Sequence, residues 1–346
     1  MLDERKIKVL CAVIDSYLRE AEPVGSRTIS KEYNLGVSSA TIRNEMSDLE
    51  ELGYLSKPHT SAGRIPSDKA YRFYVNNILK ENKIQIDIEK KEKIKRVLTR
   101  ESKELDDLIQ NSAKILSAIT SYTALALSPQ IKKMKLKHIQ LVPLDGREIL
   151  IILVGDSGIV KNTIFRLDQD ISPEQVERIS NFFNHKLKGL TISDIRKTVT
   201  VEVFREFYEY KNLLDSIIPI IINSLEDNDN VEVYLDGVTK IFDFPEYKDM
   251  EKAKSFISFI EDKDQLLNVL LNNTLEEGIE ITIGEENIYD TIKDCSLITT
   301  TYKLGDMIIG KIGVIGPTRM DYLMVISSLK LFSDNLSEIL EMLLKR

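Results

Sequence analysis

At 346 residues the chain is long enough for two or three domains, and 42% of its residues are hydrophobic, which suffices for buried cores. Its net charge is −8, yet residues 1–80 carry 12 Lys and Arg against 11 Asp and Glu, so the acidity lies in the rest of the chain and does not exclude DNA binding. Because there are two cysteines, three scattered histidines, no bilayer-length apolar run and no signal-peptide pattern, we expect a cytoplasmic protein that needs no disulfide, metal, cofactor or membrane.

The first three predicted elements are helices. Apolar residues recur at helical spacing over residues 4–20 and indicate an amphipathic helix. A second, shorter helix follows Ser26, which is an N-cap candidate. Residues 34–37 read Asn-Leu-Gly-Val and predict a tight turn, since Asn and Gly tolerate positive φ. A third helix, capped by one of two serines, covers residues 38–52.

The third predicted helix has two unlike sides. One is an apolar stripe that we expect to be buried, formed by Ile42, Met46, Leu49 and Leu52. The other carries short hydrogen-bonding side chains and one arginine: Ser39, Thr41, Arg43, Asn44 and Ser47. Arg can bind guanine and Asn adenine in a bidentate manner, and Ser or Thr can reach bases or phosphates. We therefore predict a recognition helix within a winged helix-turn-helix that ends near residue 80.

The wing is predicted from the residues that follow. Two short strands, at residues 54–57 and 64–65, enclose a loop of small residues that can lie against a phosphate backbone. Lys57, His59 and Arg64 belong to this hairpin, and Lys69 and Arg72 lie on the next predicted helix. The predicted DNA-contact residues are therefore Ser39, Thr41, Arg43, Asn44, Ser47, Lys57, His59, Arg64, Lys69 and Arg72. The alternative is a three-helix packing module that does not bind DNA.

The remainder of the chain mixes helices and strands. Residues 81–120 indicate a charged helical connector, and four β-branched segments between 122 and 167 indicate an antiparallel meander with an Asp-Gly hairpin turn at 145–146. A capping box at residues 172–175 opens a block of helices, after which strands return at 231. The sequence therefore predicts an α+β domain at residues 121–167 and 231–346, interrupted by an inserted helical domain at 168–230.

A helix predicted at residues 201–225 is very apolar for a surface helix. A symmetric dimer would bury it, because an isologous contact covers the same patch on both subunits. The candidate dimerisation residues are Phe204, Phe207, Tyr208, Leu214, Ile218 and Ile221. The alternative, left open by the sequence, is that these residues form an ordinary core within one chain.

No catalytic motif stands out. Gly310, Gly313 and Gly316 follow a GxxGxxG spacing, which differs from the spacing of phosphate-binding loops, and no Gly-Lys-Ser/Thr occurs. A nucleophile elbow and a zinc-protease motif are also missing from the sequence. We expect a protein that is not an enzyme.

Two stretches carry a family resemblance. Residues 38–55 and 59–75, which include the runs SSATIRNEM and HTSAGRIP, closely resemble the HrcA family of heat-inducible transcription repressors. Later runs at 245–249, 283–287 and 313–322 resemble the same family, with Tyr247 where Phe is expected. The resemblance covers nearly the whole chain.

The resemblance implies a fold and a function. It implies a GAF-like domain that carries an inserted dimerisation domain, and repression of heat-shock chaperone operons at an inverted-repeat operator of the CIRCE type. It also implies that the chaperonin GroEL modulates the activity. Two alternatives are a winged-helix regulator gated by a small molecule in the GAF-like domain, and a C-terminal part that serves only as an assembly scaffold.

Overall fold

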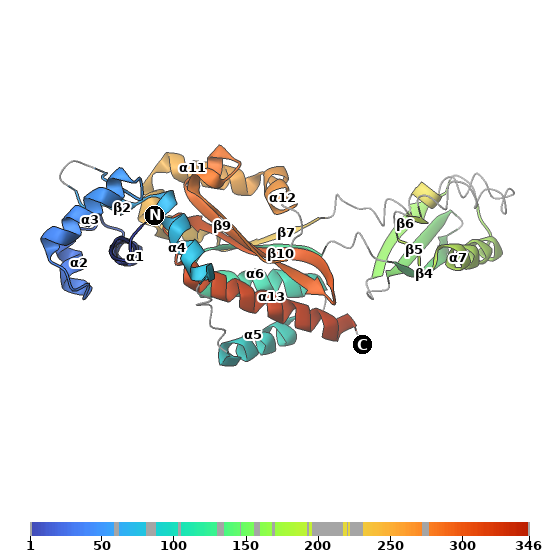
Figure 1. Cartoon of the computed structure of the whole chain (residues 1–346). Coiled ribbons are helices and arrows are strands. Elements are labelled where there is room, and N and C mark those ends of the chain that lie inside the picture. The colour runs from blue at the N-terminus through green and yellow to red at the C-terminus, as the bar shows by residue number, and fades with distance from the viewer. Residues whose placement is uncertain are drawn as a thin grey trace. The chain divides into compact units, whose positions relative to one another are not determined.

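A computed structural model describes residues 2–58, 62–80, 88–102, 105–129, 135–145, 147–155, 160–167, 170–191, 194–195, 217–219, 221, 231–271 and 277–344. The chain forms two compact units (Figure 1). The first unit comprises residues 1–128 and 232–342, and the second comprises residues 129–231 with the last four residues. Within the described residues, every helix is too short or too polar to cross a bilayer.

The N-terminal elements of the first unit agree with the predicted winged helix-turn-helix. They are α1 (Glu4–Glu20), α2 (Ser26–Glu32), α3 (Ser39–Glu51), β1 (Leu55–Ser56), β2 (Ile65–Pro66) and α4 (Asp68–Lys80). The Ser38 side chain accepts a hydrogen bond from the Thr41 backbone N–H and caps α3, as predicted. The predicted N-cap of α2 is off by one residue, since Gly25 holds that position.

The buried stripe of α3 differs from the prediction at one end. Ile42, Met46 and Leu49 are buried, but Leu52 is 47% exposed because α3 ends at Glu51 and Leu52 forms its C-cap. The buried face of α3 includes Glu45 instead of Leu52. Positions 42, 45, 46 and 49 follow the i, i+3, i+4, i+7 spacing of one helical face.

A five-stranded antiparallel sheet forms the body of the first unit. Its strand order is β7-β3-β10-β9-β8, from β3 (Thr123–Leu127), β7 (Val233–Asp236), β8 (Ile279–Ile283), β9 (Cys295–Leu304) and β10 (Met307–Pro317). Helices cover both faces (Figure 1): α6 (Leu105–Thr120) and α13 (Tyr322–Leu344) one face, α11 (Met250–Glu261) and α12 (Lys263–Leu271) the other. Four 3-10 helices connect these elements: η3 (Val238–Asp243), η4 (Pro245–Lys248), η5 (Gly284–Glu286) and η6 (Asp290–Ile292).

The predicted connector is part of this body. Helix α5 (Ile88–Glu101) packs along α13, with Ile94 and Leu98 buried. Lys91 and Lys95 both form ion pairs with Glu338 of α13. Two lysines of the charged connector therefore help to hold α5 against α13.

The second unit begins earlier than predicted. Strands β4 (Leu136–Asp145), β5 (Glu148–Gly155) and β6 (Val160–Arg166) form a separate three-stranded antiparallel sheet, which packs on α7 (Pro173–Leu187). The boundary predicted at residue 167 is therefore corrected to about 129. The described part of the insertion contains an antiparallel sheet as well as a helix, so it is not purely helical. The predicted capping box at Ser172 and Gln175 is confirmed.

The predicted apolar helix lies mostly outside the described residues, including Phe204, Phe207, Tyr208 and Leu214. Two of the candidate dimerisation residues, Ile218 and Ile221, are described and are buried against α7 and the three-stranded sheet of the same chain. For these two, the dimerisation assignment is corrected: they belong to the core of one chain.

The glycines of β10 serve close packing. A Cβ atom built at Gly310 would lie 2.2 Å from the Tyr302 ring, and one at Gly313 would lie 2.8 Å from the Ile298 carbonyl oxygen. Both positions are inside a strand that is paired on both sides. Close packing within the sheet thus accounts for these two glycines of the GxxGxxG run.

Candidate nucleic-acid interface

The outer side of α3 is the surface that the predicted recognition helix presents. Arg43 and Asn44 are exposed, and neither makes an ion pair or side-chain hydrogen bond with the described residues. Ser39 and Thr41 are half-buried, and their hydroxyls lie 3.4 Å from that of Ser26 and 3.0 Å from that of Ser38, respectively. Ser47 is half-buried as well. Arg43 and Asn44 are thus the two side chains of this helix best placed to read base edges.

The inner side of α3 is held by charge as well as by apolar packing. Glu45, 9% exposed, lies 2.9 Å from Lys6 and 3.6 Å from Arg5, both on α1. Lys6 also lies 3.0 Å from Asp48, and its hydrogen bonds to these carboxylates raise the pKa of Lys6 above its usual value. The sequence prediction missed Glu45 because it sorted the helix by polarity, although its spacing from Ile42 and Met46 places it on the buried face.

The wing cations are both turned toward α3. Arg64 donates to the Glu50 carboxylate through Nε at 3.0 Å, with Nη2 at 2.9 Å, and its side chain is only 13% exposed. Lys57 Nζ lies 3.3 Å from the same carboxylate, but its side chain is more exposed. Gly63 lies against the backbone of Pro23, where a Cβ would be 2.5 Å from the carbonyl oxygen. His59 lies outside the described residues.

The backbone of the wing is also tied to the helices. Arg64 and Val24 exchange two backbone hydrogen bonds of 2.9 Å, so the second wing strand is fixed to the segment between α1 and α2. Arg64 therefore joins three segments, which suits a structural role within the winged helix better than a role as a mobile phosphate contact.

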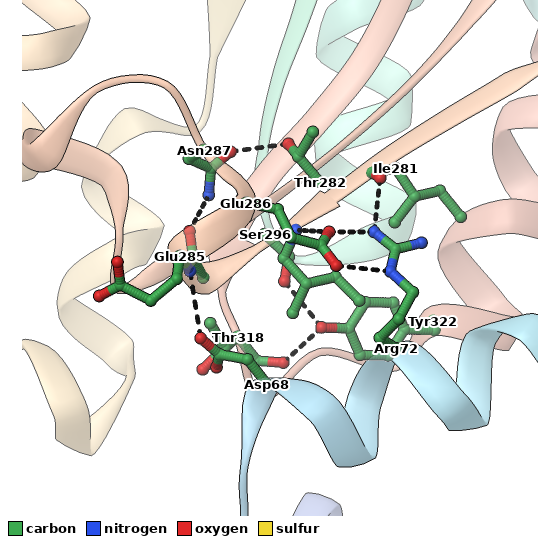
Figure 2. Close-up of polar contacts among 12 residues, drawn as sticks. Asp68, Arg72, Ile281, Thr282, Glu285, Glu286, Asn287, Ser296, Thr318 and Tyr322 are labelled. Atoms are coloured by element: carbon green, nitrogen blue, oxygen red, sulfur yellow. Dashed lines mark hydrogen bonds and ion pairs between the residues drawn. The ribbon is translucent and has the colours of Figure 1, made fainter.

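The two predicted contacts on α4 are engaged elsewhere. Lys69 Nζ donates to the Leu52 carbonyl oxygen at 2.8 Å and lies 4.5 Å from the centre of the Tyr54 ring, which stabilises the C-terminal end of α3. Arg72 binds the carboxylate of Glu286 and the carbonyl oxygen of Ile281, which belong to the body of the first unit (Figure 2). Among the predicted contacts, Arg43, Asn44 and Lys57 thus have exposed side chains on α3 or the wing, whereas Arg72 binds the body of the first unit.

Comparison with known proteins agrees with this domain organisation. Residues 1–83 match the family model described as "Winged helix-turn-helix transcription repressor, HrcA DNA-binding", and residues 106–326 match "HrcA protein C terminal domain". The chain belongs to the HrcA family. The relatives are named as repressors rather than enzymes, in agreement with the absence of a catalytic motif in the sequence.

Individual members of the HrcA family match the chain from end to end. The heat-inducible transcription repressors HrcA of Alkaliphilus metalliredigens and of Ruminiclostridium cellulolyticum are each 44% identical to it, over 98% and 99% of both sequences. A crystal structure of a hypothetical protein has the same fold, with a TM-score of 0.64 at 22% identity and 99% of each chain covered.

The contacts of the wing predict different roles for its two cations. Lys57→Ala should reduce the slope of log K against log salt by ~0.9, the effect of losing one phosphate contact, because the Lys57 side chain is exposed enough to reach DNA. Arg64→Ala should leave this slope nearly unchanged, because the charge of Arg64 is already paired with Glu50. DNA binding measured at several salt concentrations tests both, and a slope change of ~0.9 for Arg64→Ala would contradict its structural role.

Proposed function

We propose that this chain represses heat-shock chaperone operons by binding, as a homodimer, an inverted-repeat operator of the CIRCE type. The observation that carries the proposal is the asymmetry of α3: its inner side is fixed by Ile42, Glu45 and Met46, and its outer side presents Arg43 and Asn44 without partners among the described residues. A rigid helix with bare base-reading side chains is what major-groove recognition requires. Membership of the HrcA family supports heat-inducible repression as the outcome.

A specificity measurement tests the assignment of α3. Arg43→Ala should cost ~1–3 kcal/mol on an inverted-repeat duplex and should relax the preference at one base pair per half-site, if Arg43 reads a guanine. Lys57→Ala should weaken binding to all sequences about equally, since it contacts phosphate. Competition between the operator and a scrambled duplex at fixed salt separates the two effects. Equal losses on both duplexes for Arg43→Ala would contradict the base-reading role.

The second unit offers a surface for the dimer. Its three-stranded sheet buries one face against α7. The opposite face carries six apolar residues, Val142, Leu150, Ile152, Val154, Val160 and Ile164, together with the polar His138, Gln140 and Asn162. Ile164 is 63% exposed and Val160 56% exposed. When one face of an antiparallel sheet is in water, the side chains on that face are usually polar. The occupant we propose for this face is the same face of a second copy. The predicted contact through Phe204, Phe207, Tyr208 and Leu214 lies outside the described residues and stays a prediction.

Disrupting that face should separate the subunits. Ile164→Glu is expected to shift the protein toward monomer in analytical ultracentrifugation and to weaken inverted-repeat binding at least about tenfold, because the two half-sites are then bound independently. Binding to a single half-site should be unchanged. Glu177→Lys, on the exposed side of α7 in the same unit, is the matched control. A dimer that persists in Ile164→Glu would rule out this surface.

The proposed function includes modulation by GroEL, which rests on the family resemblance. The purified chain should regain operator binding after denaturation in higher yield with GroEL than without it. The yield of active repressor, measured by gel shift against total soluble protein, provides the test. Equal recovery under both conditions would remove GroEL from the proposal.

A second candidate function is regulation by a small molecule. A cavity of about 120 Å³ lies between α12 and the five-stranded sheet, lined in part by Glu280, Thr282, Asn287 and Thr299. Its size suits a ligand of several non-hydrogen atoms. A metabolite that stabilises the protein in a saturable manner and changes operator affinity would favour this candidate.

A further inference from the structure

Helix α4 lies between the winged helix and the five-stranded body, and one of its sides faces η5. Asp68 and Arg72 are four residues apart and therefore share that side. Both contact the short segment Ile281–Glu286, which includes the end of β8 (Figure 2). We call the contacts of Asp68 and Arg72 with this segment the clasp.

Arg72 makes the charged half of the clasp. Its Nε donates to Glu286 Oε1 at 2.7 Å and its Nη2 to Glu286 Oε2, so the pair is bidentate, and Nη2 also donates to the Ile281 carbonyl oxygen at 2.7 Å. Glu286 Oε2 further accepts from the Ile283 backbone N–H at 2.9 Å. Burial alone would raise the pKa of Glu286, but Arg72 and this N–H lower it below its usual value. Three of the five N–H donors of Arg72 are thus engaged within the protein, and its charge is paired with Glu286.

Asp68 makes the second half. Its Oδ2 accepts a hydrogen bond from the Glu285 backbone N–H at 3.1 Å. Burial raises the pKa of Asp68 above its usual value, although this hydrogen bond acts to lower it. The approach is close enough that a Cβ at Gly284, which has φ +56, would lie 1.8 Å from Asp68 Oδ2. A side chain at position 284 would therefore push the Asp68 carboxylate out of its contact with this segment.

The body side of the clasp is rigid. Asn287, 5% exposed, donates to three carbonyl oxygens, of Gly284, Ile292 and Cys295, at 2.8–3.0 Å. Its Oδ1 accepts from the Thr282 hydroxyl at 2.7 Å (Figure 2). The segment that receives Arg72 and Asp68 is thus fixed to β8 and β9 by buried hydrogen bonds.

The winged-helix side is rigid as well. Lys69 binds the end of α3, and Ser67, just before α4, donates to the Gly53 carbonyl oxygen at 2.7 Å. The Tyr54 and Phe73 rings meet edge to face at 5.8 Å. A displacement of α4 is therefore transmitted directly to the recognition helix and the wing.

A further set of contacts lies beside the clasp. The Tyr71 ring packs 5.7 Å from that of Tyr322, and the Tyr322 hydroxyl donates to the Thr318 carbonyl oxygen. Arg319 donates to the Leu18 carbonyl oxygen near the end of α1 at 3.0 Å. These contacts add area to the interface, whereas the clasp adds a defined orientation, because a bidentate pair is directional.

We propose that the clasp positions the recognition helix relative to the body, and that it thereby narrows the range of half-site spacings that the dimer accepts. Arg72 is a positioning residue in this proposal and does not contact DNA. The proposal rests on the dimeric operator binding proposed above. In a two-fold dimer, the separation of the two recognition helices determines the permitted spacing. A loosened clasp lets each winged helix sample many orientations, which lowers the effective concentration at the preferred spacing and raises it at others.

The first experiment compares two adjacent carboxylates. Glu286→Gln removes the negative charge and one of the two oxygens that Arg72 binds, whereas Glu285→Gln changes a side chain that pairs with Lys293 and leaves the Arg72 pair untouched. The probes are CIRCE-type inverted-repeat duplexes with shortened or lengthened spacers and a duplex with one half-site. Glu286→Gln should reduce the affinity ratio between the best and worst spacings by about tenfold or more, with half-site affinity and salt slope unchanged. Glu285→Gln should behave as the wild type.

A charge exchange tests the pair itself. Arg72→Glu should lose the spacing preference, and the double variant Arg72→Glu, Glu286→Arg should regain it, since the ion pair is rebuilt with reversed ends. A phosphate contact predicts otherwise: Arg72→Ala would then lower half-site affinity, reduce the salt slope by ~0.9, and not be rescued by a change at Glu286. That result would overturn the proposal.

Amide hydrogen exchange provides a readout that does not involve DNA. In Arg72→Ala, the Glu285 amide, which donates to Asp68, should exchange faster, and the amides of α3 should keep their protection because the winged helix stays folded. Unchanged exchange at Glu285 would overturn the clasp even if DNA binding were altered. A wild-type protein that shows no preference for inverted repeats would instead refute the proposed function. In that case, hydrogen exchange at the Glu285 amide still tests the clasp.

Discussion

The recognition helix must be immobile on one side and unoccupied on the other, and the rest of the N-terminal domain follows from this requirement. Apolar packing of Ile42, Met46 and Leu49 holds the inner side, and the buried carboxylate of Glu45 adds a charged contact to Lys6 of α1. Breaking a buried ion pair leaves an unpaired charge, so the contact opposes any rotation of α3 about its axis. Arg43 and Asn44 therefore project from a helix whose orientation is defined before DNA arrives, which reduces the entropy lost on binding.

Most cations near this helix are already used within the protein. Arg64 forms an ion pair with Glu50, Lys69 donates a hydrogen bond to the Leu52 carbonyl oxygen, and Arg72 forms an ion pair with Glu286. A basic segment in the sequence thus supplies fewer DNA contacts than its charge suggests, and more internal connections. This division suits a repressor, because internal pairs define the geometry of the winged helix and a smaller number of free cations keeps the affinity for random DNA low.

The two sheets of the protein have different relations to their surroundings. The five-stranded sheet is covered by helices on both faces, so it serves as a closed body on which α4 is positioned. The three-stranded sheet has one face on α7 and a second face on which Ile152 and Ile164 lie beside polar residues such as Gln140 and Asn162. Exposed apolar side chains gathered on one face are typical of interaction surfaces, and this is the basis of the proposed contact between two copies.

The sequence by itself determined the local elements. Helical spacing, the Ser38 cap, the Ser172 capping box and the β-branched runs sufficed to place α3, α7 and the strands, because these signals act within a few residues. It did not decide which strands share a sheet: β3 was predicted in one meander with β4, β5 and β6, but it pairs in the five-stranded sheet. It also did not decide which carboxylate pairs with each cation. Arg72 and Glu286 are 214 positions apart. Pairings of that separation depend on the packed chain, and only the tertiary structure shows that Arg72, a predicted DNA contact, pairs with Glu286.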